Sequence, residues 1–449
     1  SAMFTVVLKY PPSGDVVIPV TSLNPDEALP AVSSLTFTPA NWDQPQDVWV
    51  RGVDDAVMDG AKPFTIALEP ATSSDSHYSG RDADDVTGLN ADNDVAGITV
   101  TPTGGLVTSE TGDTTSFTVR LNSEPTADVV IPVSSNTPSE GVASVDSLTF
   151  TAADWNVPQT VTLTGVDDPI VDGTVPYTVV LGPAQSADAN YDAMDADDVF
   201  ASNTDNDVAG VDLAPSTGLV TTEAGGTATV QVRLKAQPSA DVTFTLTSSN
   251  PAEGTVAPTS ITFTPADWNV EQTVTLTGVD DARVDGDQPW TVQTSATTSA
   301  DPIFDAIEVD DLSATNTDDD AAGITVTPTA GLTTTEAGGT ATFEVVLTSE
   351  PSSDVTVPVA SSDAGEGTTD VSALTFTAAN WNVPQTVTVT GVDDRIQDGD
   401  TEYSIVLEAA ASADPNYQGV DATDVFVTNT DDDVAGITVT PTAGLGTSE

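Results

Sequence analysis

The sequence predicts an all-β protein made of tandem Ig-like antiparallel β-sandwich domains arranged as an elongated rod. Three observations predict it. The 449-residue chain repeats itself at a fixed interval of 113 residues. Within one interval, short segments rich in β-branched residues alternate in polarity and stop at Pro, Gly and Asp turn signals. No window carries a helical apolar stripe of useful length.

The repeat is marked most clearly by tryptophan and by acidic residues. The positions that recur every 113 residues include Trp42, Trp155, Trp268 and Trp381, and Glu110, Glu223, Glu336 and Glu449. One interval has the size of a single domain and exceeds the ~20–50 residues of solenoid repeats. We therefore expect each unit to have its own core.

One unit contains about seven predicted strands. In the repeat at 95–207 they are Ile98–Thr101, Thr115–Leu121, Asp128–Val133, Leu148–Thr151, Gln159–Thr164, Pro176–Leu181 and Asp198–Ala201. Seven short strands in about 110 residues is the strand number of an Ig-like sandwich. The repeated tryptophan is expected to pack one end of the core.

The period also sets the expected domains. Residues 1–3 fit nothing in the repeat and are interpreted as a cloning scar. The expected boundaries are repeat 1 at 4–94 (lacking its first strand), repeat 2 at 95–207, repeat 3 at 208–320, repeat 4 at 321–433, and the first strand of a fifth repeat at 434–449. An alternative phase, in which 434–449 closes the preceding repeat, stays open.

Composition excludes several functions. The chain has 70 acidic and 9 basic residues, a formal charge of −61, no cysteine and one histidine. Such a surface cannot neutralise nucleic-acid phosphate or anionic lipid. Cysteine nucleophiles and multi-histidine zinc sites are impossible. No apolar stretch approaches the ~20 residues that span a bilayer, so we expect no direct membrane insertion.

The informative chemistry lies in acids at predicted strand ends. Alternate strand ends of a sandwich share one pole, so loop acids that are distant in sequence can converge there. In repeat 2 these acids are Glu110, Glu140, Asp167, Asp168, Asp172, Asp205 and Asp207. Crowded carboxylates raise one another's pKa. Calcium, which takes 6–8 oxygen ligands in irregular geometry, resolves the repulsion, and one domain could hold two or more ions.

The run from Ile324 to Asp433 resembles a Calx-β domain, and the resemblance extends over all four repeats. It implies a calcium cluster at the pole near the next domain. Position by position, the implied ligands are the opening-strand Glu110, Glu223 and Glu336; the loop acids Glu27, Glu140, Glu253 and Glu366; the pairs Asp54–Asp55, Asp167–Asp168, Asp280–Asp281 and Asp393–Asp394; the following Asp59, Asp172, Asp285 and Asp398; and the closing Asp92 and Asp94, Asp205 and Asp207, Asp318, Asp319 and Asp320, and Asp431, Asp432 and Asp433.

The chain departs from the family pattern at several positions. The loop acid is Glu where the family commonly has Asp, the acid after the Asp pair is Asp where the family has Glu, and repeat 1 lacks the opening-strand Glu. A further glutamate, three residues after that following acid, is replaced by Lys62, Val175, Gln288 and Thr401. The phrase at residues 380–394 (NWNVPQTVTVTGVDD) is similar to tandem repeats of very large bacterial surface and adhesin-like proteins.

Simpler interpretations stay open beside this one. Asp-Asp and Asp-Gly pairs are good turn formers, and an acidic surface suits a salty habitat. A second cluster, Asp82, Asp84 and Asp85, with counterparts Asp195, Asp197 and Asp198, is either a further ion site or a solvated strand edge.

The expected function is a calcium-stabilised structural extender of a secreted or cell-surface bacterial protein. In this hypothesis Ca²⁺ at the joints stiffens a monomeric rod of adjacent repeats, on the order of 150 Å long, which projects a distal domain toward an unknown adhesion target. The alternative is a glycan- or protein-binding module, for which exposed aromatics are expected and only Trp49 and Trp290 lie outside the repeated Trp position. We expect no enzyme activity, since catalytic acids occur once per chain and these recur in every unit.

Overall fold

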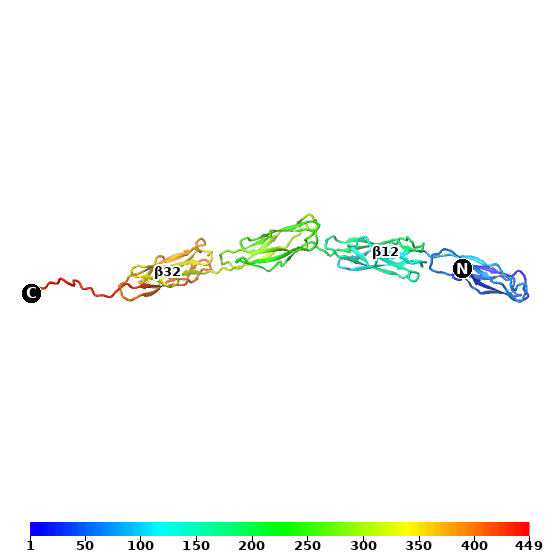
Figure 1. Cartoon of the computed structure of the whole chain (residues 1–449), viewed down its shortest axis with the longest axis horizontal. Coiled ribbons are helices and arrows are strands. Elements are labelled where there is room, and N and C mark those ends of the chain that lie inside the picture. The colour runs from blue at the N-terminus through cyan, green and yellow to red at the C-terminus, as the bar shows by residue number, and fades with distance from the viewer. Residues whose placement is uncertain (449) are drawn as a thin grey trace. The chain divides into compact units, whose positions relative to one another are not determined.

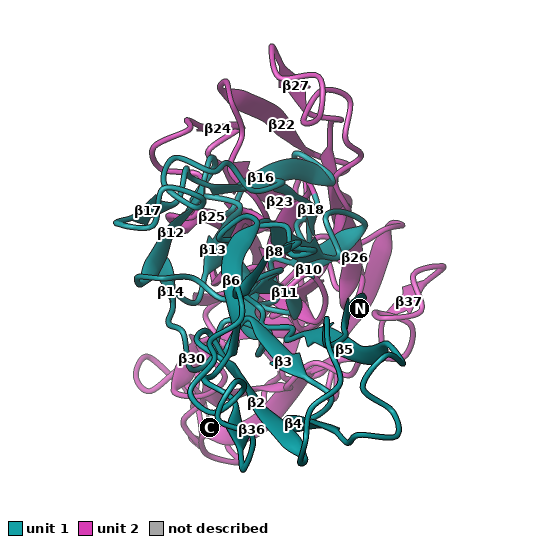
Figure 2. Cartoon of the chain, turned by 90° about the vertical axis from the view of Figure 1, so that its right-hand side faces the viewer, with its two compact units in different colours: residues 1–208 teal, residues 209–449 magenta. Residues whose placement is uncertain are grey.

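The computed structural model describes residues 1–448, and all regular secondary structure in that range is β-strand (Figure 1). The predicted all-β fold is confirmed. The chain divides into two compact units, residues 1–208 and residues 209–449, and each contains two repeats (Figure 2). Within the described residues, no helix is long and apolar enough to cross a membrane.

The first unit contains repeats 1 and 2. The strands of repeat 1 are β1 (Ala2–Val6), β2 (Val16–Ser22), β3 (Ala28–Pro30), β4 (Ser34–Phe37), β5 (Gln46–Gly52), β6 (Lys62–Leu68), β7 (Thr72–Ser73) and β8 (Val86–Asn90). Those of repeat 2 are β9 (Ile98–Thr101), β10 (Leu106–Ser109), β11 (Thr114–Leu121), β12 (Val129–Ser135), β13 (Gly141–Ala143), β14 (Ser147–Phe150), β15 (Gln159–Gly165), β16 (Val175–Leu181), β17 (Gln185–Ser186) and β18 (Val199–Thr204).

The second unit contains repeats 3 and 4. The strands of repeat 3 are β19 (Val211–Ala214), β20 (Leu219–Thr222), β21 (Thr227–Leu234), β22 (Val242–Ser248), β23 (Gly254–Ala257), β24 (Ser260–Phe263), β25 (Gln272–Gly278), β26 (Gln288–Thr294), β27 (Thr298–Ser299) and β28 (Leu312–Thr317). Those of repeat 4 are β29 (Ile324–Thr327), β30 (Leu332–Thr335), β31 (Thr340–Leu347), β32 (Val355–Ser361), β33 (Gly367–Thr369), β34 (Ala373–Phe376), β35 (Gln385–Gly391), β36 (Thr401–Leu407), β37 (Ala411–Ser412) and β38 (Val425–Thr430).

Two sheets form each sandwich. In repeat 2 one sheet has the order β13-β15-β11-β9, and the other has the order β10-β18-β16-β12-β14 with β17 on β12. Alternation drives this arrangement, because successive side chains of a strand point to opposite faces. In β12, Val129, Ile131 and Val133 face the core and the residues between them do not. All pairings of β9 to β18 stay inside the repeat.

The start of repeats 2, 3 and 4 corrects one expectation. The sequence suggested a single opening strand that ends at Glu110, but the structure has two strands there. β9 pairs antiparallel with β11, and β10 pairs parallel with β18 in the opposite sheet. Pro102 lacks the N–H that a continuing ladder would need, and Gly105 takes a positive φ of 74°. The chain therefore crosses between the sheets before it reaches Glu110.

The repeated tryptophans have the expected structural role. Trp42, Trp155 and Trp381 are partly buried and pack against the cores of their own repeats. Their main chains also fix the neighbouring strand end. The N–H of Leu121, for example, donates to the carbonyl of Trp155 at 2.9 Å.

The two ends of the chain differ from the complete repeats. Ala2 and Met3, interpreted as a scar, are part of β1 and pair with Val50 and Trp49. Residues 434–448, expected as the first strand of a fifth repeat, form no strand in the structure. The equivalent β9, β19 and β29 each pair with the next long strand of their own repeat. Glu449 itself lies outside the described residues.

Candidate metal centre

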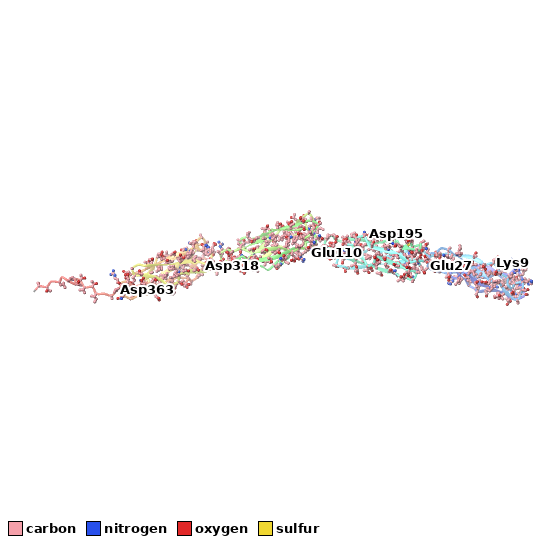
Figure 3. All side chains as sticks on the ribbon, viewed as in Figure 1. Lys9, Glu27, Glu110, Asp195, Asp318 and Asp363 are labelled. Carbon is pink, nitrogen blue, oxygen red and sulfur yellow. The ribbon has the colours of Figure 1, made fainter. Side chains whose placement is uncertain are left out.

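Three strand ends deliver the acids of repeat 2 to one pole. β10 and β18 run parallel, with Ser109 opposite Thr204, so the residues that follow them emerge side by side. The N–H of Glu110 donates to the carbonyl of Thr204 at 3.0 Å. The Glu110 side chain turns back and accepts the N–H of Asn206 at 3.0 Å. Figure 3 shows Glu110 at one end of its sandwich.

The acids form two adjacent groups in repeat 2. Glu110, Asp205 and Asp207 each offer an oxygen within 4.8 Å of the others, and so do Glu140, Asp168 and Asp172. Such separations suit carboxylates that share a cation, and Ca²⁺ fits a donor set made only of oxygen.

The same arrangement recurs in other repeats. The corresponding groups with oxygens within 4.8 Å are Glu253, Asp281 and Asp285; Glu27, Asp55 and Asp59; and Glu223, Asp319 and Asp320, where Asp319 is the counterpart of Asn206. Figure 3 labels Glu27 and Asp318 at ends of their repeats. These groups bring together residues that the sequence predicted as ligands from separate loops.

The remaining predicted acids lie around these groups. Asp167 accepts the side-chain N–H of Asn206 at 3.0 Å, and Asp280 is close enough to raise the pKa of Asp320. The pKa of Asp94 is likewise raised, first by burial and then by the charges of Asp92, Asp54 and other acids. In repeat 4, the acids whose charges act on one another are Glu336, Asp393, Asp394, Asp431, Asp432 and Asp433.

Two predicted residues of repeat 4 match their counterparts in other repeats. Glu366 accepts the side-chain N–H of Asn429 at 3.3 Å, as Glu27 accepts that of Asn90 at 3.3 Å. Asp398 lies in the loop between β35 and β36 and is exposed.

One oxygen in each of three repeats has no partner. The Oδ2 atoms of Asp207, Asp320 and Asp433 are buried and have no hydrogen-bond partner among the described residues. A buried carboxylate oxygen without a donor costs a large part of its hydration energy. The three residues are equivalent positions of the repeat. A cation is a suitable partner for carboxylate oxygens in this position.

Electrostatics supports the same conclusion. Burial, followed by the charges of Asp205, Asp168 and Asp172, raises the pKa of Glu110 to about 7. Burial and the equivalent acids raise the pKa of Glu223 to about 7. Burial also raises the pKa of Asp207, and Asp205 and Asp167 add to it. No basic side chain offsets these effects in repeat 2, since its one cation, Arg120, is in β11.

Asp205 behaves differently within the same cluster. Burial opposes its ionisation, but N–H groups of Gly173 at 2.8 Å and Asp207 at 2.6 Å outweigh burial and lower its pKa. Gly173 has a φ of +76°, which side chains with a Cβ rarely adopt. Asp205 is thus held ionised while its neighbours resist ionisation, as expected where a cation completes the charge balance.

The sequence reasoning missed an asparagine that holds the three strand ends together. Asn203 is 1% exposed, donates to the carbonyl of Val166 at 2.9 Å and accepts from the hydroxyl of Thr108 at 2.9 Å. Its equivalents are Asn90, Asn316 and Asn429, and two of them, Asn316 and Asn429, make both of these bonds. The recurrence of Asn every 113 residues was the available signal.

The open question of the second acidic cluster is answered for its last member. Asp85 and Asp198 accept backbone N–H groups of Leu68 at 3.1 Å and Leu181 at 3.0 Å. These carboxylates fasten the end of a strand, which is a structural role.

Repeat 1 has an altered version of the centre. It has no described counterpart of Glu110, and Lys62 Nζ lies 3.1 Å from Asp59 Oδ2. The charge of Asp59 is therefore already balanced by the ammonium group of Lys62, a role that a metal ion would have in the other repeats.

We expect repeat 1 to bind calcium more weakly than the other repeats, and Lys62→Gln to tighten its weakest site by up to about fivefold, because one exposed ion pair contributes up to ~1 kcal/mol. Calorimetric titration with calcium measures this. Lys9→Gln makes the same charge change away from the cluster, as Figure 3 shows. An equal effect of Lys9→Gln would assign the gain to net charge.

The two non-repeated tryptophans differ in exposure. Trp290 is 3% exposed and belongs to the core of repeat 3, whereas Trp49 is 53% exposed. Of the two aromatic candidates for a binding surface, only Trp49 is therefore accessible.

Comparison with known proteins identifies one family. The Calx-beta domain profile matches residues 21–94 and 318–433. Solved structures similar to the chain include the crystal structure of CBD12 from CALX1.2 (14% identity, 48% of this chain and 98% of that chain, TM-score 0.26). The calcium binding domain CBD12 of CALX1.1 is similar at 14% identity, over 49% of this chain and 99% of that chain, with a TM-score of 0.28.

A longer match is to domains 4–9 of the surface layer protein SbsC, at 12% identity over 96% of this chain and 60% of that chain, with a TM-score of 0.20. The search of curated protein sequences finds no match.

Proposed function

The chain contains Calx-beta domains at residues 21–94 and 318–433, and we propose that it is a calcium-stabilised structural extender of a secreted or cell-surface protein. In this proposal, ions bound in one repeat fix the next repeat in place. One of the similar solved structures is itself described as a calcium binding domain, CBD12 of CALX1.1. The acids gathered in each repeat would hold the ions, which supply the positive charge that the cluster lacks.

One observation carries the proposal: the loop between the second and third acids of a cluster binds the following repeat. In the first unit, the N–H of Glu124 donates to the carbonyl of Ala56 at 2.7 Å, and the side chain of Asn190 donates to the carbonyl of Met58 at 2.7 Å. Ala56 and Met58 lie between Asp55 and Asp59, which belong to one acidic group.

The second unit repeats these contacts. The N–H of Glu350 donates to the carbonyl of Ala282 at 2.6 Å, and Asn416 donates to the carbonyl of Val284 at 2.8 Å. Arg283 adds an ion pair with Glu350 at 2.7 Å. The loop thus has acids at both of its ends and the next repeat against its middle, so a cation that rigidifies the loop also rigidifies the joint.

Asn190, which donates to the loop of the preceding repeat, is itself held firmly. The carboxylate of Asp188, 5% exposed, accepts the N–H of Asn190 at 2.9 Å and the N–H of Thr126 at 2.8 Å. A fixed donor loses little conformational entropy when it binds, which favours a defined geometry over a loose contact.

The proposal is tested by fluorescence distance measurements inside the first unit. The chain has no cysteine, so Thr36→Cys and Thr149→Cys, both exposed, place one dye on each repeat. We expect calcium to narrow the distance distribution. The Asn190→Ala variant should bind calcium with unchanged stoichiometry but keep the broad distribution. A distribution that calcium leaves unchanged, although calcium binds, would mean that the ions stabilise single repeats and not the joint.

A further inference from the structure

A methionine lies in the joint between repeats 1 and 2. Met58 is 37% exposed and belongs to the loop between Asp55 and Asp59. Its carbonyl accepts the side-chain N–H of Asn190 at 2.7 Å, and its sulfur accepts the backbone N–H of Ala96 at 3.2 Å. Ala96 packs against the core of repeat 2. The sulfur therefore contacts the beginning of the next repeat while part of the side chain stays open to solvent.

The same position in repeat 4 shows how an oxygen binds the same donor. The counterpart of Met58 is Gln397, and that of Ala96 is Ala435, each three repeat periods later. Gln397 Oε1 accepts the N–H of Ala435 at 2.7 Å, a shorter contact than that of Ala96 with sulfur. A thioether sulfur is a weak acceptor, whereas an amide oxygen is an ordinary strong one. The backbone at this position thus accommodates a side chain that ends in an oxygen acceptor.

Oxidation gives methionine an oxygen at the corresponding place. In glutamine the acceptor oxygen is bonded to the third side-chain atom, Cδ, and in methionine sulfoxide it is bonded to the third side-chain atom, Sδ. Hydrogen peroxide supplies this oxygen: the sulfur lone pair attacks one peroxide oxygen, an S–O bond forms and the O–O bond breaks. Sulfur is oxidised by two electrons, and the departing hydroxide takes the proton of the transferred oxygen and leaves as water. Val171 and Val284, which occupy this position in repeats 2 and 3, have no such chemistry.

We propose that Met58 is a site of reversible oxidation by peroxide, and that its sulfoxide oxygen accepts the N–H of Ala96 and tightens the joint between repeats 1 and 2. Of the three methionines, Met58 is the one whose sulfur accepts an N–H among the described residues. The inference concerns the same joint as the proposed function. It does not rest on calcium, since neither atom of this hydrogen bond belongs to an acidic side chain.

The surroundings of Met58 favour a gain over a loss. Oxidation of a methionine in a core is disruptive because it places a polar oxygen among apolar groups. Met58 is partly open to solvent, and a donor already faces its sulfur. Replacing a weak acceptor by a strong one at an exposed contact should shift the equilibrium between the closed and the open contact by about twofold to tenfold.

Hydrogen exchange of the Ala96 amide tests the proposal directly. Met3→Leu and Met194→Leu leave Met58 as the only methionine of the chain. This chain is treated with hydrogen peroxide, peptide mass spectrometry locates the added oxygen, and NMR of alanine-labelled protein follows the exchange. We expect one added oxygen on Met58 and slower exchange of the Ala96 amide by about twofold to tenfold. Methionine sulfoxide reductases should reverse both changes, and Met58→Gln in the otherwise unmodified chain should show the slower exchange without peroxide.

The matched control is Met58→Leu in the same background, which keeps an apolar side chain but has no acceptor. Its Ala96 amide should exchange faster than that of the unoxidised chain and should not respond to peroxide. The Ala184 amide, which donates to the carbonyl of residue 194 within repeat 2, reports opening of that repeat and should stay constant.

Three results would overturn the proposal. The first is unchanged or faster exchange of the Ala96 amide in the oxidised chain. The second is a response of Met58→Leu to peroxide. The third is a Met58 that keeps its thioether at a peroxide concentration that fully oxidises Met3, which is 47% exposed, in the unmodified chain.

Tightening of the joint itself is measured without peroxide. Met58→Gln and Met58→Leu are each introduced into the chain labelled at Thr36→Cys and Thr149→Cys. We expect a narrower distance distribution for Met58→Gln than for Met58→Leu, both with calcium and with chelator. Because the two variants are compared in one buffer, this result is independent of whether calcium acts on the joint. Equal distributions would mean that the acceptor at this position does not influence the joint, and the proposal would be wrong.

Discussion

Chelation of calcium is expected to lower the midpoint of thermal unfolding by on the order of 10 °C for each ion that a repeat loses. An ion present at about 100 times its dissociation constant contributes about 2.7 kcal/mol to stability. For a domain of about 110 residues, 1 kcal/mol corresponds to about 4 °C. The loss should be large here because the acids repel one another once the ion is gone. Calorimetric scans with calcium and with chelator measure it.

A pair of variants tests the assignment to the acidic cluster. Asp207→Asn removes a charge at the buried oxygen that has no partner, so we expect it to destabilise the calcium-loaded chain and to stabilise the chelated one. Asp154→Asn makes the same change outside the cluster, where repeats 1 and 4 already have Asn41 and Asn380 accepting the equivalent N–H of Thr38 and Thr377. The control should respond to calcium as the unmodified chain does. Loss of stability in Asp207→Asn under chelation would indicate that this residue has a turn-forming role.

The dependence of stability on pH is expected to reverse its sign when calcium is removed. The folded pKa of Glu110 is about 7, above its ordinary value of 4.5. Between these two values the unfolded chain ionises and the folded chain retains the proton. The stabilising contribution is therefore fully present below pH 4.5 and is lost as pH rises through about 7, amounting to about 3 kcal/mol for this group. Glu223 has the same raised pKa in repeat 3.

Calcium reverses this slope because it binds the ionised carboxylates and releases their protons. The loaded chain should gain stability as pH rises over the same interval. Denaturant unfolding at several pH values, with chelator and with calcium, gives both slopes. Glu110→Gln should flatten the slope of the chelated chain for repeat 2. Parallel slopes in the two conditions would contradict the coupling of protons and metal at this centre.

The fold could be predicted from the sequence because its signals are local and repeated four times. Alternation in segments such as 129–135, together with Pro and Asp-Gly turns, defines most strands without tertiary information. The very short strands β13 and β17, of three and two residues, could not be predicted, since their backbone is extended only by pairing with a neighbour. The separate strand β10 was missed for a related reason: its parallel pairing with β18 joins residues almost a whole repeat apart.

The metal centre was predictable in composition but not in arrangement. Acids at strand ends indicated a cluster, and the structure brings Glu110, Asp205 and Asp207 together as expected. The division into two groups of acids depends on how β10 lies beside β18, which no local pattern shows. The role of Asn203 was missed because a buried asparagine resembles any other strand-end residue until its three neighbours are placed. Lys62 was noted only as a departure from a family pattern, and its ion pair with Asp59 required the loop geometry.

The parallel contact between β10 and β18 has a consequence for biosynthesis. Glu110 precedes the rest of its repeat and Asp207 closes it, so the ligand set spans nearly the whole length of the repeat. A repeat that is still incomplete has its carboxylates but no assembled metal site until its final strand joins the sheet. High-affinity ion capture would then report that a repeat is complete, and a chain interrupted inside a repeat would be left with an unfilled and self-repelling end.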